Sequence, residues 1–239
     1  MTSTACDGRP RVSVILPAHN EAAAIAAVVR DCRAAVSGSD EIVVVDDGST
    51  DATADAAAEA GARVIRLERN HGKGHALRLG IEQSTGEILV FLDADGQDDP
   101  LEIPLLLAPL AEGADLVIGS RFLGRFDPGA IKPVNRLGTL ALTSIVNALF
   151  GVRVTDILAG FRAMRRTLLD RVILQAKGYE IETDLLLQTL KIGARVTEVP
   201  VRRRARRHGQ SGLNPINDGL RILGRILRVR WDTLRAVGT

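Results

Sequence analysis

The sequence predicts an α/β fold in which helices cover both faces of a mostly parallel β-sheet. Through the first 120 residues, short runs rich in Val, Ile and Leu alternate with alanine-rich segments, which is the pattern of successive βα units. The chain has 239 residues, of which 46% are hydrophobic, so it can bury a large core as one large domain or two small ones. Polar clusters follow several apolar runs, at the strand ends where such sheets bind ligands.

The expected strands are short and apolar, as is typical of strands buried on both faces. They span residues 12–16, 41–45, 63–67, 87–92 and 115–118. The expected helices span residues 21–36, 51–60, 73–84 and 101–111. Side chains that can cap a helix stand at three of the helix starts, namely Asn20, Thr50 or Asp51, and Asp99. Each polar cluster therefore also has a purely structural interpretation.

Cysteine usage and hydropathy indicate an intracellular protein. Cys6 and Cys32 form no framework of disulfides or metal ligands, and the first ten residues lack the apolar core of a signal peptide. The longest uncharged segment, residues 137–152, is shorter than the roughly 20 residues of a membrane span and contains polar residues. We expect it to form a buried or interfacial helix.

Charge is distributed unevenly along the chain. Residues 1–120 hold 9 Lys or Arg and 20 Asp or Glu, whereas residues 121–239 hold 22 and 9. This division suits a metal-binding acidic half and a phosphate-facing basic half. The run of arginines at residues 202–207 is also compatible with nucleic acid, but only 3% of residues are aromatic and no nucleic-acid module frames the run. We therefore expect no nucleic-acid partner.

The strongest single motif follows the strand expected at residues 87–92. Asp93 and Asp95 lie two positions apart, and Gln97 adds an amide oxygen. Such hard oxygen ligands suit Mg²⁺ or Mn²⁺ that keeps open positions for the phosphates of a substrate. The alternative is an acidic loop that caps the next helix through Asp99. Similar clusters at residues 17–21 and 46–51 would meet the motif at one sheet edge, which favours a shared binding cleft.

A glycine-rich segment at residues 70–77 separates the second and third clusters. Its glycines precede a helix, so backbone N–H groups and Lys73 can meet an anion. The spacing differs from that of a Walker loop. His71 and His75 are four residues apart, but no suitable third ligand stands nearby for zinc.

Together these motifs resemble the family 2 glycosyltransferases with the A-type nucleotide-sugar fold. The matching segments are residues 14–21, 45–51, 70–74 and 93–97. Four later segments narrow the resemblance to the polyprenyl-phosphate (dolichyl-phosphate) mannose or glucose synthase branch; they are residues 119–122, 155–162, 178–182 and 207–214. The resemblance covers about residues 11–225.

The resemblance implies a role for each matched residue. Pro17, Ala18, Glu21 and Asp47 would line the nucleoside pocket, and Lys73 and Gly74 would lie near the same nucleotide. Asp93, Asp95 and Gln97 would hold Mg²⁺ or Mn²⁺ on the donor diphosphate. Arg121, helped by Arg136, would bind the acceptor phosphate. Arg207, His208 and Ser211 would close over the donor diphosphate.

The chain departs from this branch at two positions. His19 replaces a Tyr or Phe, and Gly212 follows Ser211 where the branch has a lysine. The missing lysine leaves Arg207 or a neighbouring arginine to neutralise the diphosphate, and it leaves room for a different acceptor.

The implied reaction is transfer of a hexosyl group from a nucleoside diphosphate sugar, with inversion. A phosphate acceptor is already largely ionised at neutral pH and needs no general base. A hydroxyl acceptor would need a carboxylate as a base, for which Asp156, Glu182 and Asp184 are candidates. The resemblance also implies that Asp156 lies in the active site, and no motif decides which of these carboxylates acts as the base. The expected organisation is a flexible N-terminus at 1–10, a glycosyltransferase domain at 11–212 with a nucleotide-binding half (11–120) and an acceptor half (121–212), and a helix at 213–239.

That C-terminal helix alternates apolar and basic residues and includes Trp231. It either packs on the core with its arginines in water or binds the anionic surface of a membrane. The second interpretation predicts a cytoplasmic enzyme at the inner membrane face that acts on polyprenyl phosphate. The alternatives are a family 2 enzyme with a soluble hydroxyl acceptor and a binding protein without catalysis. No motif distinguishes GDP- from UDP-sugars, one hexose from another, or one oligomeric state from another.

Overall fold

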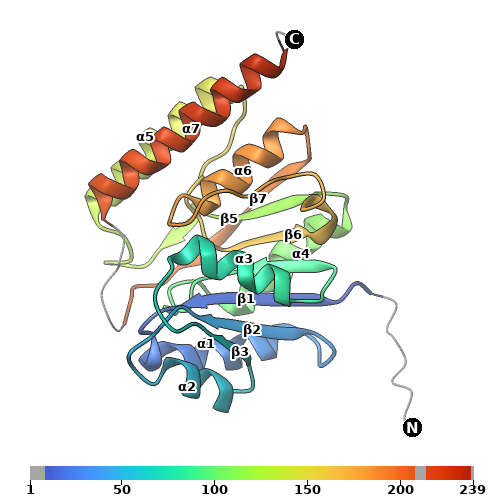
Figure 1. Ribbon diagram of the computed structural model, residues 1–239, viewed down its shortest axis with the longest axis vertical. Coiled ribbons are helices and arrows are strands. Elements are labelled where there is room, and N and C mark those ends of the chain that lie inside the picture. Colours follow the sequence, from blue (N-terminus) through green and yellow to red (C-terminus); the bar gives the residue numbers. More distant parts are fainter. Residues whose placement is uncertain (1–8, 208–213, 238–239) are drawn as a thin grey trace.

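The computed structural model describes residues 9–207 and 214–237, and these form a seven-stranded sheet between two layers of helices (Figure 1). The strand order is β3-β2-β1-β4-β6-β5-β7. The strands are β1 (Val12–Ala18), β2 (Glu41–Asp46), β3 (Arg63–Arg66), β4 (Ile88–Phe91), β5 (Leu116–Phe126), β6 (Arg162–Arg165) and β7 (Val196–Arg203). Among these, β6 alone runs antiparallel to its neighbours β4 and β5. The predicted mostly parallel α/β fold is confirmed.

The helices divide between the two faces of the sheet. They are α1 (Ala22–Ala35), α2 (Thr53–Glu59), α3 (Lys73–Gln83), α4 (Ile103–Ala111), α5 (Pro133–Phe150), α6 (Ile181–Lys191) and α7 (Pro215–Val237), with 3-10 turns η1 (Pro100–Glu102) and η2 (Arg166–Leu168). One core joins α1, α2 and α4 to the sheet, and a second joins α3, α5, α6 and α7 to the opposite face. Alternate residues of β1 serve the two cores, with Val14 in the first and Ile15 in the second, because successive side chains of a strand point to opposite faces.

All five strands and all four helices expected within the first 120 residues are present, with ends within two residues of the prediction except that β5 continues to Phe126. The helices expected near residues 137–152 and 213–239 correspond to α5 and α7. β6 and β7 were not predicted. The predicted boundary between the two halves, residue 120, falls inside β5, so the two halves share one continuous sheet. The structure does not describe residues 1–8, so most of the expected flexible N-terminus lies outside it.

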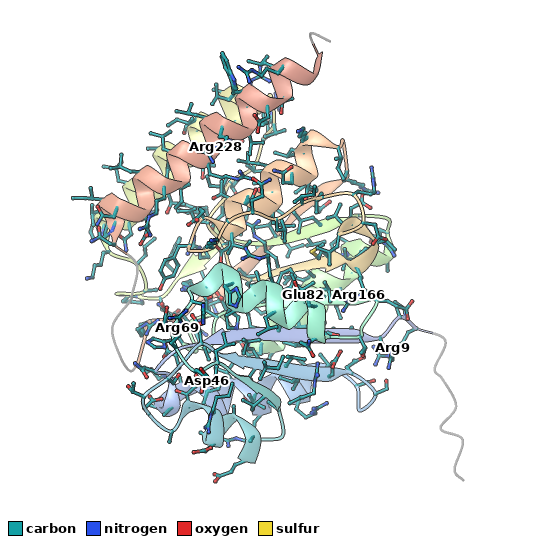
Figure 2. All side chains as sticks on the ribbon, in the orientation of Figure 1. Arg9, Asp46, Arg69, Glu82, Arg166 and Arg228 are labelled. Atoms are coloured by element: carbon teal, nitrogen blue, oxygen red, sulfur yellow. The ribbon has the colours of Figure 1, made fainter. Side chains whose placement is uncertain are left out.

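Helices α5 and α7 lie side by side along one edge of the molecule (Figure 1). The side chains of Ile222, Ile226 and Val229 on α7 are buried against the core, and Arg228 on the same helix is exposed (Figure 2). A buried ion pair also fixes α7, because Arg225 contacts the buried Asp184 of α6 at 2.7 Å. Within residues 9–207 and 214–237, no helix combines the length and the apolar character needed to cross a membrane.

Candidate functional site

A cleft of about 830 Å³ opens at the carboxyl ends of the parallel strands. Its size is that of an ordinary small-molecule site. The cleft is lined by the loops after β1, β2 and β4, the loop before α6, the segment after β7 and the first turns of α7. Predicted residues that line it are Pro17, Ala18, Glu21, Asp47, Lys73, Asp93, Asp95, Gln97 and Arg121. The sheet edge therefore brings together most of the residues that the sequence singled out.

The loop after β2 shapes the side of the cleft where the nucleoside is expected. The two carboxylate oxygens of Asp47 accept hydrogen bonds from the backbone N–H groups of His71 and Gly72, each at 2.8 Å. Gly48 has a φ of +70°, and a Cβ there would lie 2.3 Å from the backbone of Arg69. Only glycine lets the two loops approach so closely. His19, which replaces the Tyr or Phe of the branch, lines the same region, and its Nδ1 lies 2.9 Å from the carbonyl oxygen of Asp47.

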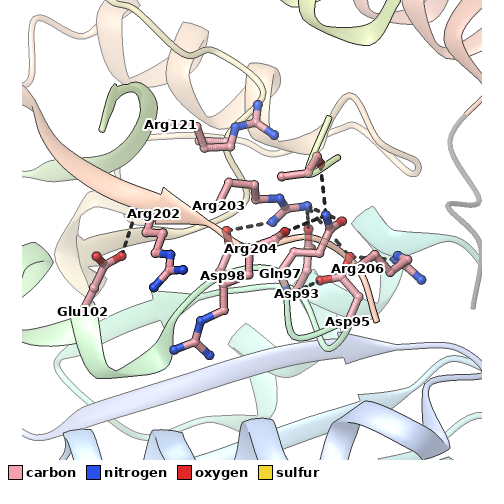
Figure 3. Close-up of polar contacts among 12 residues, drawn as sticks. Asp93, Asp95, Gln97, Asp98, Glu102, Arg121, Arg202, Arg203, Arg204 and Arg206 are labelled. Carbon is pink, nitrogen blue, oxygen red and sulfur yellow. Dashed lines mark hydrogen bonds and ion pairs between the residues drawn. The ribbon is translucent and has the colours of Figure 1, made fainter. Parts of the chain in front are cut away.

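The oxygens predicted to bind metal converge on one point, which a guanidinium nitrogen occupies (Figure 3). Arg203 Nη2 lies 3.0 Å from Gln97 Oε1, 3.8 Å from Asp95 Oδ2 and 3.9 Å from Asp93 Oδ2. Two carboxylates and an amide around a single cation are a donor set that fits Mg²⁺ or Mn²⁺ with positions left for phosphate oxygens. The described residues contain no group of three or more His, Cys, Asp or Glu side chains that could hold a metal, so these carboxylates would need further ligands from a substrate or water.

Charges around this point lower the pKa of Asp93. Burial alone would raise the pKa of Asp93, but Lys73 and Arg203 outweigh it and lower that pKa to about 2. Lys73 Nζ lies 2.5 Å from Asp93 Oδ1 and 2.5 Å from Glu182 Oε1. Although burial opposes it, this pair of carboxylates raises the pKa of Lys73 above its ordinary value. Lys73 thus acts as a permanent cation at the base of the cleft.

The predicted role of Gly74 near the nucleotide is not supported by its position. Gly74 is buried, and a Cβ there would lie 2.8 Å from the carbonyl oxygen of Ala176 and from the carbonyl carbon of Lys177. Glycine is needed at this position because helix α3 packs directly on the backbone of residues 176–177.

Arg121 enters the cleft from β5 and is held by a buried carboxylate. Its Nε and Nη2 contact the two oxygens of Asp156 at 2.6 and 2.7 Å, and Asp156 also accepts the backbone N–H of Arg121. Glu198 in turn accepts the N–H groups of Thr155 and Asp156. Burial raises the pKa of Glu198. This chain of contacts positions one guanidinium toward the cleft.

Asp156, one of the three candidate bases, is not placed for proton transfer. Its side chain is fully buried, does not line the cleft and is bound on both oxygens by Arg121. Asp184 is likewise buried and paired with Arg225. Of the three predicted candidates, Glu182 is the one that lines the cleft. Asp156 is therefore positioned as the partner of Arg121.

Other predicted residues lie outside the cleft or outside the described residues. Arg136 is exposed on the first turn of α5, with its guanidinium 5.8 Å from the ring centre of Phe126, and it does not line the cleft. Arg207 is exposed at the end of the described segment and is also absent from the lining. His208 and Ser211 lie outside the described residues. His71 and His75 stack on each other, with ring centres 4.8 Å apart.

Most arginines of the basic run pair with acidic residues, and all of these partners except Asp127 come from residues 1–120. Arg202 pairs with Asp127, Arg203 with Asp98, Arg204 with Asp99, and Arg206 with Asp95 and Glu21. Much of the uneven charge along the sequence is therefore neutralised within the fold. These pairs give the run a structural role that needs no nucleic acid.

Several residues that form the site were not assigned a role from the sequence. Arg162 is fully buried and donates to the carbonyl oxygens of Ile157, Ala159 and Glu182. These bonds connect the loop before β6 to helix α6. Burial lowers the pKa of Arg162 to about 10. Asn217, Asp218 and Arg221 line the cleft from α7. The sequence signal for them was a group of polar side chains at the start of the amphipathic C-terminal helix.

The fold defines the class of protein as an α/β enzyme of the GT-A type, with a polar cleft at the carboxyl ends of the parallel strands. The family model described as Glycosyl transferase family 2 matches residues 13–173, and the chain belongs to this family.

Known relatives share this family with different acceptors. The chain is 36% identical over 210 residues to glycosyltransferase AglJ of Haloferax volcanii, covering 87% of this chain and 68% of that protein. It is 35% identical over 246 residues to undecaprenyl-phosphate mannosyltransferase of Micrococcus luteus, covering 95% and 98%. Among solved structures, it is similar to glucosyl-3-phosphoglycerate synthase of Mycobacterium tuberculosis in complex with Mn²⁺, UDP and phosphoglyceric acid. That match has 30% identity and a TM-score of 0.75, and it covers 92% of this chain and 78% of that one.

Proposed function

We propose that this glycosyltransferase moves a hexosyl group from a nucleoside diphosphate sugar to polyprenyl phosphate, with inversion, in a reaction that needs Mg²⁺ or Mn²⁺. The observation that carries the donor side is the convergence of Asp93, Asp95 and Gln97 oxygens on one cationic position in the cleft. A related structure that holds Mn²⁺ and UDP supports the same ligand class. Bound there, the metal would act as a Lewis acid on the leaving diphosphate.

The residues of the chain would bind and orient the two substrates. Pro17, Ala18 and Asp47 would contact the nucleoside, and Lys73 would hold Asp93 in place through their ion pair. Asp156 would aim Arg121 at the acceptor phosphate, because it binds Nε and Nη2 and leaves Nη1 toward the anion. The acceptor phosphate, already ionised at neutral pH, would attack the anomeric carbon directly. Positioning and electrostatic stabilisation would then supply most of the rate enhancement.

A lipid acceptor is favoured by an exposed apolar surface on α5 and α7, here called the α5/α7 face. Its large apolar side chains are each more than 40% exposed; they are Val134, Leu137, Leu140, Ile216, Leu220, Leu227, Trp231 and Leu234. Arg228 and Arg235 are exposed on the same helix pair, and Arg235 stacks on Trp231 at 5.0 Å. Apolar and basic side chains together suit an anionic membrane surface. The first turns of α7 line the cleft, so this face lies next to the acceptor entrance.

The α5/α7 face gives a testable membrane prediction. Replacing Leu220 and Trp231 together by glutamate should weaken binding to phosphatidylcholine–phosphatidylglycerol vesicles by about tenfold or more, because each large apolar side chain contributes about 1.5–3 kcal/mol when fully buried. Cosedimentation measures the bound fraction. Replacing Leu101 and Leu105 by glutamate is the matched control, since these leucines are 54% and 47% exposed in η1 and α4. Equal losses in both variants would show that the α5/α7 face has no special role.

A second candidate acceptor is a soluble phosphorylated metabolite, which the similarity to glucosyl-3-phosphoglycerate synthase favours. The test supplies purified protein with Mn²⁺ or Mg²⁺, labelled UDP- and GDP-hexoses, and either a short polyprenyl phosphate or phosphoglyceric acid. Our proposal predicts label in the organic phase with the lipid. Label transferred only to phosphoglyceric acid would instead support the soluble acceptor.

A further inference from the structure

Two arginines at the end of β7 and just after it contact the oxygens that the proposed metal would bind. Arg203 Nη2 stands among the Asp93, Asp95 and Gln97 oxygens, as described above. Arg206 Nη2 lies 2.7 Å from Asp95 Oδ2, and its Nη1 lies 3.0 Å from Glu21 Oε1. Asp95 Oδ2 therefore contacts two guanidinium groups at once (Figure 3).

These arginines offset a strong local repulsion. Asp93, Asp95 and Asp98 crowd together, and Asp95 and Asp98 have side chains less than a tenth exposed. The guanidinium groups of Arg203 and Arg206 lie among these carboxylates and offset their negative charge.

The two arginines differ in their place in the fold. Arg203 is the last residue of β7 and also pairs with Asp98 at 2.7 Å. Arg206 lies three residues beyond the strand, in a segment without regular structure. Its guanidinium can thus change partners without breaking the sheet, whereas Arg203 can withdraw Nη2 and keep its pair with Asp98.

We propose that Arg203 and Arg206 compete with the divalent ion for the predicted metal ligands, so that the ion binds tightly only together with a nucleoside diphosphate. A dication and a guanidinium repel each other at a shared carboxylate oxygen. The diphosphate supplies new negative charge, and the displaced arginines transfer to it through charge-assisted hydrogen bonds. Metal and nucleotide then raise each other's affinity by the same factor, as linkage requires. The exchange rests on the metal site of the proposed function.

The test measures Mn²⁺ binding to the full-length protein by electron paramagnetic resonance, with and without UDP or GDP. Wild-type protein should bind Mn²⁺ weakly alone and much more tightly with nucleotide. Arg206→Ala should bind Mn²⁺ alone about tenfold more tightly than wild type, a gain of about 1.4 kcal/mol, because one competing ion pair is gone. The factor by which nucleotide improves Mn²⁺ binding should shrink by a similar amount.

Two further variants make the result specific. Arg202→Ala removes an arginine of the same run that pairs with Asp127 outside the cleft, and it should bind Mn²⁺ as wild type does. Arg203→Lys keeps a positive charge beside Asp98 but removes the nitrogen that stands among the three oxygens, and it should also bind Mn²⁺ alone more tightly.

Different failures have different meanings. Mn²⁺ affinity that is equal in wild type, Arg206→Ala and Arg203→Lys, with nucleotide still improving binding, would overturn the competition and leave the metal site intact. Absence of Mn²⁺ binding in every variant, even with UDP or GDP, would overturn the metal site of the proposed function and the competition with it.

Discussion

An Asp95→Ala variant is expected to lose about a hundred- to a thousandfold in kcat for hexosyl transfer. Asp95 is one of the two carboxylates proposed to hold the metal on the donor diphosphate, and its Oδ2 lies within 3.8 Å of Arg203 Nη2. Removing it would leave charge on the leaving group without its main stabilisation. The rate of label transfer at saturating donor and acceptor measures the effect.

Asp127→Ala is the matched control for this loss. Asp127 pairs with Arg202 and does not line the cleft, so its removal should change kcat less than about twofold while still deleting an aspartate–arginine pair. Circular dichroism spectra of both variants check that the fold is kept. A kcat within tenfold of wild type for Asp95→Ala would contradict the assigned metal ligand.

An Arg121→Lys variant should lower kcat/KM for the phosphate acceptor by about a hundredfold, with little change in donor affinity. Lysine keeps a positive charge beside the buried Asp156, so the folded state is not destabilised by an unpaired buried carboxylate. Lysine lacks the planar guanidinium group, which contacts Asp156 through two nitrogens and can offer a third nitrogen to an anion. Initial rates over a range of acceptor concentrations, together with donor titrations, separate the two effects.

Asp156→Asn distinguishes positioning from base catalysis. If Asp156 only holds Arg121, this variant should lower kcat/KM for the acceptor by about tenfold and leave the shape of the pH–rate profile unchanged. Loss of the acidic limb of that profile would instead show that Asp156 accepts a proton, contrary to its buried position.

The nucleotide-binding half could be predicted from the sequence because its signals are local. β2 and β4 each contain four consecutive apolar residues, and polar clusters follow directly after them, as Asp93 and Asp95 follow β4. Parallel pairing then brings the clusters to one edge without further information. The same logic placed Asp47 in one cleft with Asp93 and Asp95.

The acceptor half was predicted less well because its strands carry charge. β6 reads Arg-Ala-Met-Arg, and its first residue, Arg162, is fully buried only because three backbone carbonyl oxygens accept its donors. β7 contains Pro200 and ends in two arginines. Neither segment has the apolar alternation that marks a strand.

The partners of the arginine run also could not be read from the sequence. Arg203 and Asp98 are separated by 105 residues. Their contact depends on the pairing of β7 with β5, which shifts register between Ser120 and Arg125. A one-residue change in such pairing would point Arg203 to the other face of the sheet. The charge imbalance of the two halves was visible in the sequence, but its neutralisation inside the cleft was not.

The most direct test of the metal and donor site is anomalous scattering from a crystal grown with Mn²⁺ and UDP or GDP. We expect one manganese peak in the cleft, bonded to Asp95 and to the diphosphate, with Asp93 and Gln97 next to it. We also expect Arg206 to have moved from Asp95 to a phosphate oxygen. A diphosphate bound in the cleft with no manganese peak, and with Arg203 and Arg206 still on the carboxylates, would contradict this prediction.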